Sequence, residues 1–100
     1  MHLSYDKDND STQKMILLIS QLQTQSKFPL VIARCSKLLN TARSSPYKSY
    51  PTVVVFEKNA LRLLAEAASA NMNENESRQM EILNEVASLI EMRNNVLKEI

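Results

Sequence analysis

The chain has 100 residues, of which 44% are hydrophobic and 23% are charged, and its formal net charge is +1. These values are typical of one small globular domain. The chain contains no glycine, whereas phosphate-binding loops, dinucleotide-binding turns and nucleophile elbows need glycine where the backbone takes a positive φ angle or approaches a phosphate closely. The composition therefore excludes these enzyme classes.

Cysteine content and charge distribution bear on the protein's compartment and on its partners. A single cysteine, Cys35, cannot form an intramolecular disulfide, and the sequence has neither a short apolar run preceded by a basic start nor about eighteen consecutive apolar residues. We therefore expect an intracellular protein, cytoplasmic or nuclear. Residues 11–56 contain six basic and no acidic residues, whereas residues 57–100 contain eight glutamates and five basic residues. This asymmetry is either neutralised within the fold or presents a basic face to an acidic partner.

The first ten residues are polar and lack an apolar period. We therefore expect a flexible N-terminal tail, residues 1–10, before a single helical domain, residues 11–100. Asp10 or Ser11 can cap a first helix. Apolar residues then recur with the spacing of one helical face: Met15, Leu18, Ile19 and Leu22.

Phe28-Pro29 marks the start of a second helix, because proline disfavours helix in the residue before it and suits the first turn of the helix that follows. Ser44-Ser45-Pro46 marks its end. Between them the apolar residues again keep a helical period: Val31, Cys35, Leu38 and Ala42.

A third helix is expected from about Val53 to Ala70, with Thr52 as its cap. Val53–Phe56 has high strand propensity, so a short strand is the alternative for this segment. Helix is favoured because a two-stranded sheet is not stable alone. The positions expected to face inward keep the helical period: Phe56, Ala60, Leu63, Leu64 and Ala67.

A fourth helix follows the polar loop Asn71–Asn75, with Asn75 or Asn73 as its cap. It carries two apolar lines, Met80-Leu83-Ala87-Ile90-Leu97 and Ile82-Val86-Leu89-Val96-Ile100. At 1.5 Å per residue this helix is roughly 37 Å long, whereas the second is nearer 20 Å. Asn94 interrupts the first line, where it either sets the register of a helix pair or marks where the line leaves the core.

These elements predict an all-α bundle of three or four helices with a long C-terminal helix. A long helix over shorter ones leaves apolar side chains uncovered, and the first helix is apolar nearly all round, so we expect a protein partner in a homo- or hetero-oligomer. The residues predicted to form the partner interface lie on the first and last helices: Ile16, Leu17, Ile82, Val86, Leu89, Val96 and Ile100.

Candidate chemistry is sparse. His2 and Cys35 are the single histidine and the single cysteine and lie far apart in the sequence, so we expect neither a metal site nor a cysteine nucleophile. Cys35 is interpreted as a small core residue. Glu81 and Glu85, one helical turn apart, are interpreted as solvated surface carboxylates. We therefore predict no catalytic residue, no cofactor and no small-molecule substrate.

A basic face is predicted around the second helix, and the Ser-Pro sequence after it makes Ser45 a possible phosphorylation site. The function predicted is that of a non-catalytic interaction module, a small subunit or adaptor of a multi-protein assembly. The alternative is a nucleic-acid-associated regulator that uses the basic face. No membrane partner is expected. The basic face consists of Lys27, Arg34, Lys37, Arg43 and Lys48.

Overall fold

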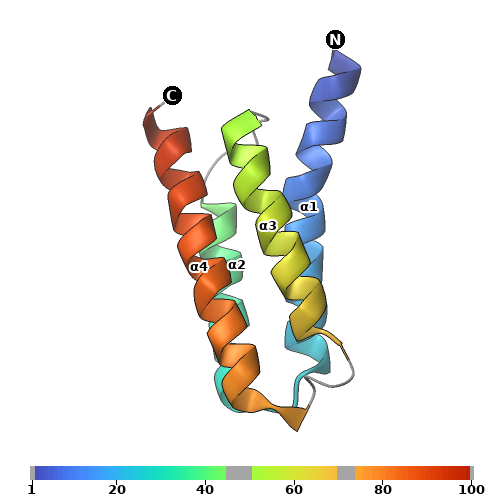
Figure 1. The fold of residues 1–100 in the computed structure, drawn as a ribbon, viewed down its shortest axis with the longest axis vertical. Coiled ribbons are helices and arrows are strands. Elements are labelled where there is room, and N and C mark those ends of the chain that lie inside the picture. Colours follow the sequence, from blue (N-terminus) through green and yellow to red (C-terminus); the bar gives the residue numbers. More distant parts are fainter. Residues whose placement is uncertain (1, 45–50, 70–73, 100) are drawn as a thin grey trace.

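The computed structural model describes residues 2–44, 51–69 and 74–99, and it places them in four helices (Figure 1). These are α1 (His2–Gln25), α2 (Pro29–Arg43), α3 (Pro51–Ala67) and α4 (Glu76–Glu99). The predicted all-α bundle is confirmed. None of the described helices is both long and apolar enough to span a bilayer.

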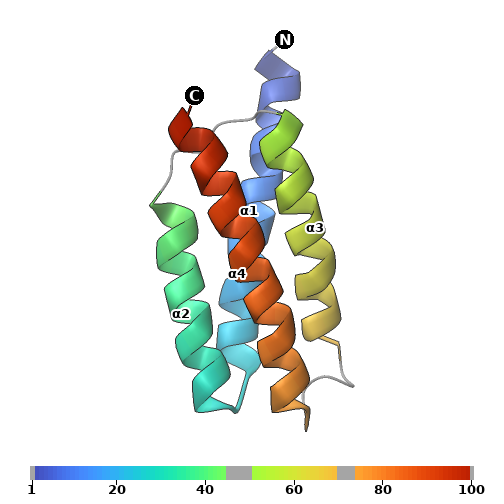
Figure 2. The same cartoon turned by 60° about the vertical axis from the view of Figure 1, so that its left-hand side comes forward.

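The four helices form two antiparallel hairpins, α1 with α2 and α3 with α4, that pack side by side (Figures 1 and 2). In the packed bundle α1 lies against α2 and α3, and α4 lies against the same two helices. Contacts between the hairpins are thus made by helices that run in the same direction, α1 with α3 and α2 with α4. Although α2 and α3 are consecutive in the chain, they occupy opposite corners of the bundle.

Local sequence signals set the starts of two helices, α2 and α4. Pro29 opens α2 after Phe28, whose backbone is extended at φ −97° and ψ 117°. The amide of Phe28 donates to Ser26 Oγ at 3.1 Å. Asn75 caps α4, because its Oδ1 accepts a hydrogen bond of 3.0 Å from the amide of Arg78. The predicted start of α2 and the Asn75 cap are therefore confirmed.

The first helix begins at His2, so the start predicted at Asp10 or Ser11 is wrong. Residues 2–25 contain neither proline nor glycine, and nothing in the covalent chain interrupts the helix before its apolar part. Ser11 instead turns its hydroxyl inward to Glu57. Figure 1 shows the N-terminal turns of α1 projecting beyond the ends of the other helices. A flexible tail over residues 1–10 stays a prediction.

Helix α3 includes Val53–Phe56, so the helical alternative for that segment is confirmed. Its rotation differs from the prediction, since Phe56 and Leu63 are half-buried and lie at the sides of the core. The helix packs between α1 and α4 on a face that includes a glutamate. The fully buried face contains Val53, Glu57, Ala60, Leu64 and Ala67.

Helix α4 has 24 residues, against 15 in α2 and 17 in α3, so it is longer than both of its neighbours. Both of its apolar lines contribute to the core, because α3 covers one side of the helix and α2 covers the other. One contiguous apolar core results, and its largest fully buried members are Met15, Ile19, Leu22, Leu64, Ile82, Leu83 and Ile90.

Candidate functional sites

A charged pair lies inside the bundle. Glu57 of α3 and Arg93 of α4 are each 1% exposed, and Arg93 Nε lies 2.7 Å from Glu57 Oε2. Two charges of opposite sign cancel at this level of the core, which removes the cost of an unpaired buried charge. The pair is 36 residues apart in the sequence and joins the two helices of one hairpin.

Hydrogen bonds extend this pair to the helices of the other hairpin. From α1, the Ser11 hydroxyl donates to Glu57 Oε1 at 2.5 Å and the Thr12 hydroxyl donates to Glu57 Oε2. Toward α2, Arg93 Nη1 donates to the Ala42 carbonyl at 3.4 Å. A continuous set of polar contacts, which we call the polar layer, therefore crosses all four helices.

Asn94 completes the polar layer beside α2. Its Oδ1 accepts a hydrogen bond of 2.5 Å from Arg93 Nη1, and its Nδ2 donates to the Thr41 carbonyl at 2.9 Å. The two carbonyls that the layer uses, those of Thr41 and Ala42, belong to the last turn of α2, where carbonyls have no partner within the helix. Arg93 Nη2 is buried and has no hydrogen-bond partner among the described residues.

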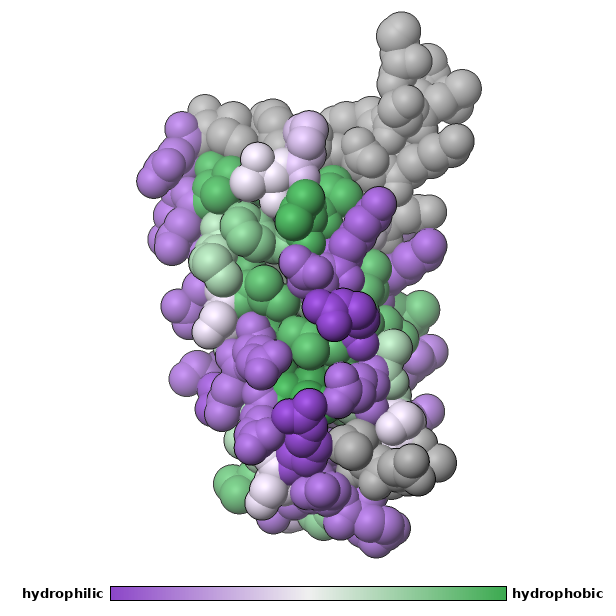
Figure 3. Space-filling view, in the orientation of Figure 1, coloured by the Kyte–Doolittle hydropathy of each residue, from purple (hydrophilic) through white to green (hydrophobic). Residues whose placement is uncertain are grey.

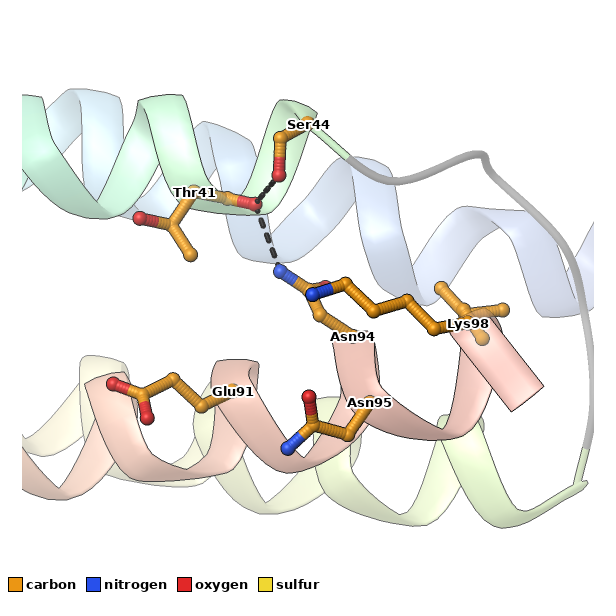
Figure 4. Close-up of a pocket in the computed structure, with 7 residues that line it drawn as sticks. Thr41, Ser44, Glu91, Asn94, Asn95 and Lys98 are labelled. Atoms are coloured by element: carbon orange, nitrogen blue, oxygen red, sulfur yellow. Dashed lines mark hydrogen bonds between the residues drawn. The ribbon is translucent and has the colours of Figure 1, made fainter.

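A hollow of about 430 Å³, lined mainly by polar residues, opens where α2 ends against α4 (Figure 4). The Thr41 carbonyl at its wall accepts from Asn94 Nδ2 and from the Ser44 hydroxyl, the latter at 2.8 Å. Glu91 and Lys98 of α4 lie at opposite ends of the view. The Ser44 hydroxyl donates to a backbone carbonyl in the last turn of α2, as polar side chains at helix ends commonly do. The hollow is lined by Thr41, Ser44, Glu91, Asn94, Asn95, Leu97 and Lys98.

A second hollow, of about 420 Å³, lies between α3 and α4 on the outer face of their hairpin. Figure 3 views this face and shows hydrophobic atoms in a band between hydrophilic ones. Leu63 and Leu89 are half-buried at its floor, and Met92 remains 44% exposed beside them. We call this feature the α3/α4 groove; it is lined by Asn59, Arg62, Leu63, Glu85, Ser88, Leu89 and Met92.

The residues of the predicted partner interface differ in exposure: some are buried in the core and others lie at the surface. Ile82 and Val86 are fully buried in the core of this chain, so their assignment to a partner surface is wrong: α3 covers the side of α4 on which they lie. Leu89 is half-buried in the α3/α4 groove. The remaining predicted interface residues are Ile16 and Val96, half-buried, Leu17, 55% exposed, and Ile100, which lies outside the described residues.

Of the predicted basic face, half-buried Arg34 and exposed Lys37 lie side by side on α2. Arg43 is exposed at the end of the helix but follows Arg34 by nine residues, so it lies on the opposite side of α2. Among the described residues none of these three is in an ion pair, whereas Lys27 contacts Glu74 at 2.6 Å. Two predicted positions, Lys48 and the candidate phosphorylation site Ser45, lie outside the described residues.

Cys35 on α2 does not share a site with Glu81 and Glu85 on α4. Cys35 is fully buried, as predicted, and burial raises the pKa of its thiol to about 11. The Glu81 carboxylate is exposed and contacts Arg78 at 2.8 Å, and Glu85 is exposed at the rim of the α3/α4 groove. Within residues 2–44, 51–69 and 74–99 no group of three histidine, cysteine or carboxylate side chains is placed to hold a metal ion.

Comparison with models of protein families, with curated protein sequences and with solved structures finds no match to this chain.

The sequence analysis missed the polar layer, although the spacing contains a signal for it. Glu57 falls four residues after Val53 and three before Ala60, both of which are core positions. Arg93 falls three residues after Ile90 and four before Leu97. Charged residues of opposite sign thus occupy the apolar faces of two helices, which indicates a buried pair.

Proposed function

We propose that this protein is a non-catalytic helical interaction module that binds a protein partner through the α3/α4 groove. The observation that carries the proposal is the exposure of apolar side chains there, with Met92 44% exposed above Leu63 and Leu89. Interface centres are enriched in methionine and other large apolar side chains and are surrounded by a polar rim. Asn59, Arg62, Glu85 and Ser88 supply such a rim.

The apolar surface continues beyond the groove along both helices. Val55 precedes Asn59 by one helical turn on α3 and is 57% exposed, and Val96 follows Met92 by one turn on α4 and is half-buried. Burial of apolar surface returns about 25 cal/mol per Å². A partner helix laid along the groove gains this free energy without rearranging the core.

Photo-crosslinking in the cells that naturally make the protein tests the proposal. A benzophenone amino acid replaces Ser88, which lines the groove, or Ser36, which is exposed on α2 and serves as the matched control. We expect a specific adduct from position 88 and none from position 36. Absence of an adduct at position 88 overturns the proposal, and an adduct at position 36 alone moves the partner surface to α2.

The unpaired basic residues of α2 favour a second candidate, a regulator that contacts nucleic acid. Arg34, Lys37 and Arg43 carry three positive charges on a helix with no acidic residue. Phosphate contacts release counterions, so binding through this face weakens steeply as salt rises.

Fluorescence anisotropy with a labelled 20-base-pair duplex and a 20-base single-stranded RNA, at 50 and 200 mM salt, tests the second candidate. The Arg34→Glu/Lys37→Glu variant should stay folded, because neither side chain is in an ion pair among the described residues and surface substitutions change stability by about 0.5 kcal/mol or less each. If α2 binds nucleic acid, this variant loses binding and the salt dependence becomes shallower. If the unmodified chain does not bind at 50 mM salt, the candidate is rejected.

A further inference from the structure

We infer that the partner in the α3/α4 groove is a second copy of this chain, in a parallel dimer whose two-fold axis runs along the groove. The inference rests on the proposed function, since it names the occupant of the same surface. Its basis is the placement of two opposite charges, Arg62 and Glu85, on the two sides of one apolar groove.

Arg62 and Glu85 are both exposed, and neither is in an ion pair among the described residues. Arg62 belongs to α3 and Glu85 belongs to α4. Both side chains are therefore available to a partner at the rim of the groove, where hydrophilic side chains frame the apolar band (Figure 3).

The two charges lie at the same level of the bundle. Two contacts show which residues of α3 and α4 lie at the same height along the bundle. Glu57 pairs with Arg93, and Gln79 Nε2 donates to the Ala67 carbonyl at 3.0 Å. Arg62 lies midway between Glu57 and Ala67 along α3. Glu85 lies next to the residue midway between Gln79 and Arg93 along α4.

A two-fold axis along the groove places α3 of each copy against α4 of the other. Because Arg62 and Glu85 share a level, Arg62 of each copy then faces Glu85 of the other, and two ion pairs flank the apolar centre. An isologous interface requires this kind of self-complementarity. Leu63 of the two copies meets between the charges, and Leu89 and Met92 meet about one and two helical turns further along the axis.

The face that carries the groove is large enough for a stable dimer. The molecule measures 43 × 23 × 17 Å, and α3 and α4 occupy the front of the view down its shortest axis (Figure 1). Stable interfaces bury roughly 800 Å² on each partner. Helices α3 and α4, about 26 and 36 Å long and each about 10 Å wide, present a face of that order without any change in the bundle.

Charge reversal with complementation tests the dimer. In Arg62→Glu and in Glu85→Arg, each homodimer contains two like-charge pairs, so we expect the dimer Kd from analytical ultracentrifugation to rise at least about tenfold. Mixing the two variants restores opposite charges at both pairs, so we expect a heterodimer to form. The double variant Arg62→Glu/Glu85→Arg should dimerise like the unmodified chain.

Two controls have the same change in charge at sites away from the groove. Arg43→Glu on α2 and Glu91→Arg, on the side of α4 that faces α2, are both exposed positions and should leave the dimer Kd within twofold of the unmodified value. Circular dichroism melting of every variant checks that the bundle is folded. If the variants of Arg62 and Glu85 weaken the dimer but their mixture does not recover it, the parallel pairing is wrong.

The outcomes separate this inference from the proposed function. A monomer at 200 µM, together with a position-88 adduct to a different protein, overturns the dimer and leaves the interaction module standing. A dimer unaffected by Arg62→Glu and Glu85→Arg also overturns the inference, since the interface then lies elsewhere. Loss of both the dimer and the position-88 adduct removes the inference and the function together.

Discussion

Arg93 and Glu57 occupy core positions at which a small bundle ordinarily has apolar side chains. Their charges are compensated by each other and by hydroxyl and carbonyl groups from α1 and α2. A buried ion pair gains little net stability, because desolvation offsets the attraction between the charges. Loss of one partner is costly, because the other charge stays buried.

We expect Arg93→Met to lower the free energy of unfolding by about 3–5 kcal/mol, since it leaves the Glu57 carboxylate buried without its cation. Arg43→Met, the same chemical change at an exposed position of α2, should alter stability by about 0.5 kcal/mol or less. Urea denaturation at pH 7 followed by circular dichroism measures both. Equal stability of the two variants would show that the pair is not buried.

Cys35 makes the free energy of unfolding depend on pH in the alkaline range. Burial raises its pKa from 9.0 to about 11, so the folded state holds the thiol proton at pH values where the unfolded chain releases it. The stabilisation is complete below pH 9 and is lost as pH rises through 11.

The Cys35 contribution is measured as the difference in unfolding free energy between the unmodified chain and Cys35→Ala at pH 8, 9.5 and 11. We expect the advantage of the unmodified chain to shrink across this range. The buried thiol should also resist alkylation by iodoacetamide in the native protein and react after unfolding in urea. A constant difference between the two proteins from pH 8 to 11 contradicts the raised pKa.

At the scale of the elements, the start of α4 depends on one side chain. Asn75 Oδ1 satisfies the amide of Arg78, which has no partner within the helix. Asn75→Ala should therefore destabilise the protein by about 0.5–2 kcal/mol. The control is Asn84→Ala, an exposed position inside α4, where alanine's higher helix propensity should leave stability equal or slightly greater. Thermal melts of the two variants should separate; coincident melts would reject the cap.

Helix positions were predictable because they depend on local signals. The 3.6-residue period, Pro29 and Asn75 act within one or two turns, and the structure confirms them. The rotation of α3 was not predictable from hydropathy, because Phe56 is more apolar than Glu57 yet Glu57 lies inside. Its partner, Arg93, is 36 residues away, a distance that no helical period connects.

The candidate site was predictable only in part, for a related reason. The wide apolar surface of α4 was evident, but which line the chain itself covers depends on where α2 and α3 lie against it. Leu89 faces the α3/α4 groove, whereas Val86, three residues earlier, is fully buried. The groove also takes Arg62 and Leu63 from α3, and the sequence analysis did not bring the two helices together.

At the scale of the whole molecule, two antiparallel hairpins can be stacked in two ways. In the structure α1 lies against α3, and α4 against α2. Turning one hairpin over would instead set α1 against α4 and α2 against α3, giving a ring in which every helix neighbours the next one in the chain. Apolar side chains distinguish poorly between these arrangements, because side chains of similar volume can pack in either of them.

The polar layer discriminates between these two topologies. Its bonds join α1 to α3, α3 to α4 and α4 to α2; in the sequential ring Ser11 would lie diagonally across from Glu57, and Asn94 would lose the Thr41 carbonyl. The sequential ring is therefore disfavoured, because it leaves buried polar and charged groups of the polar layer without their hydrogen-bond partners. We expect Glu57→Leu/Arg93→Leu to stay helical but to give more than one set of amide resonances in ¹H–¹⁵N spectra, whereas a single native-like set would mean that loops or apolar packing alone choose the topology. In this bundle, a buried ion pair that gains little net stability excludes the sequential ring.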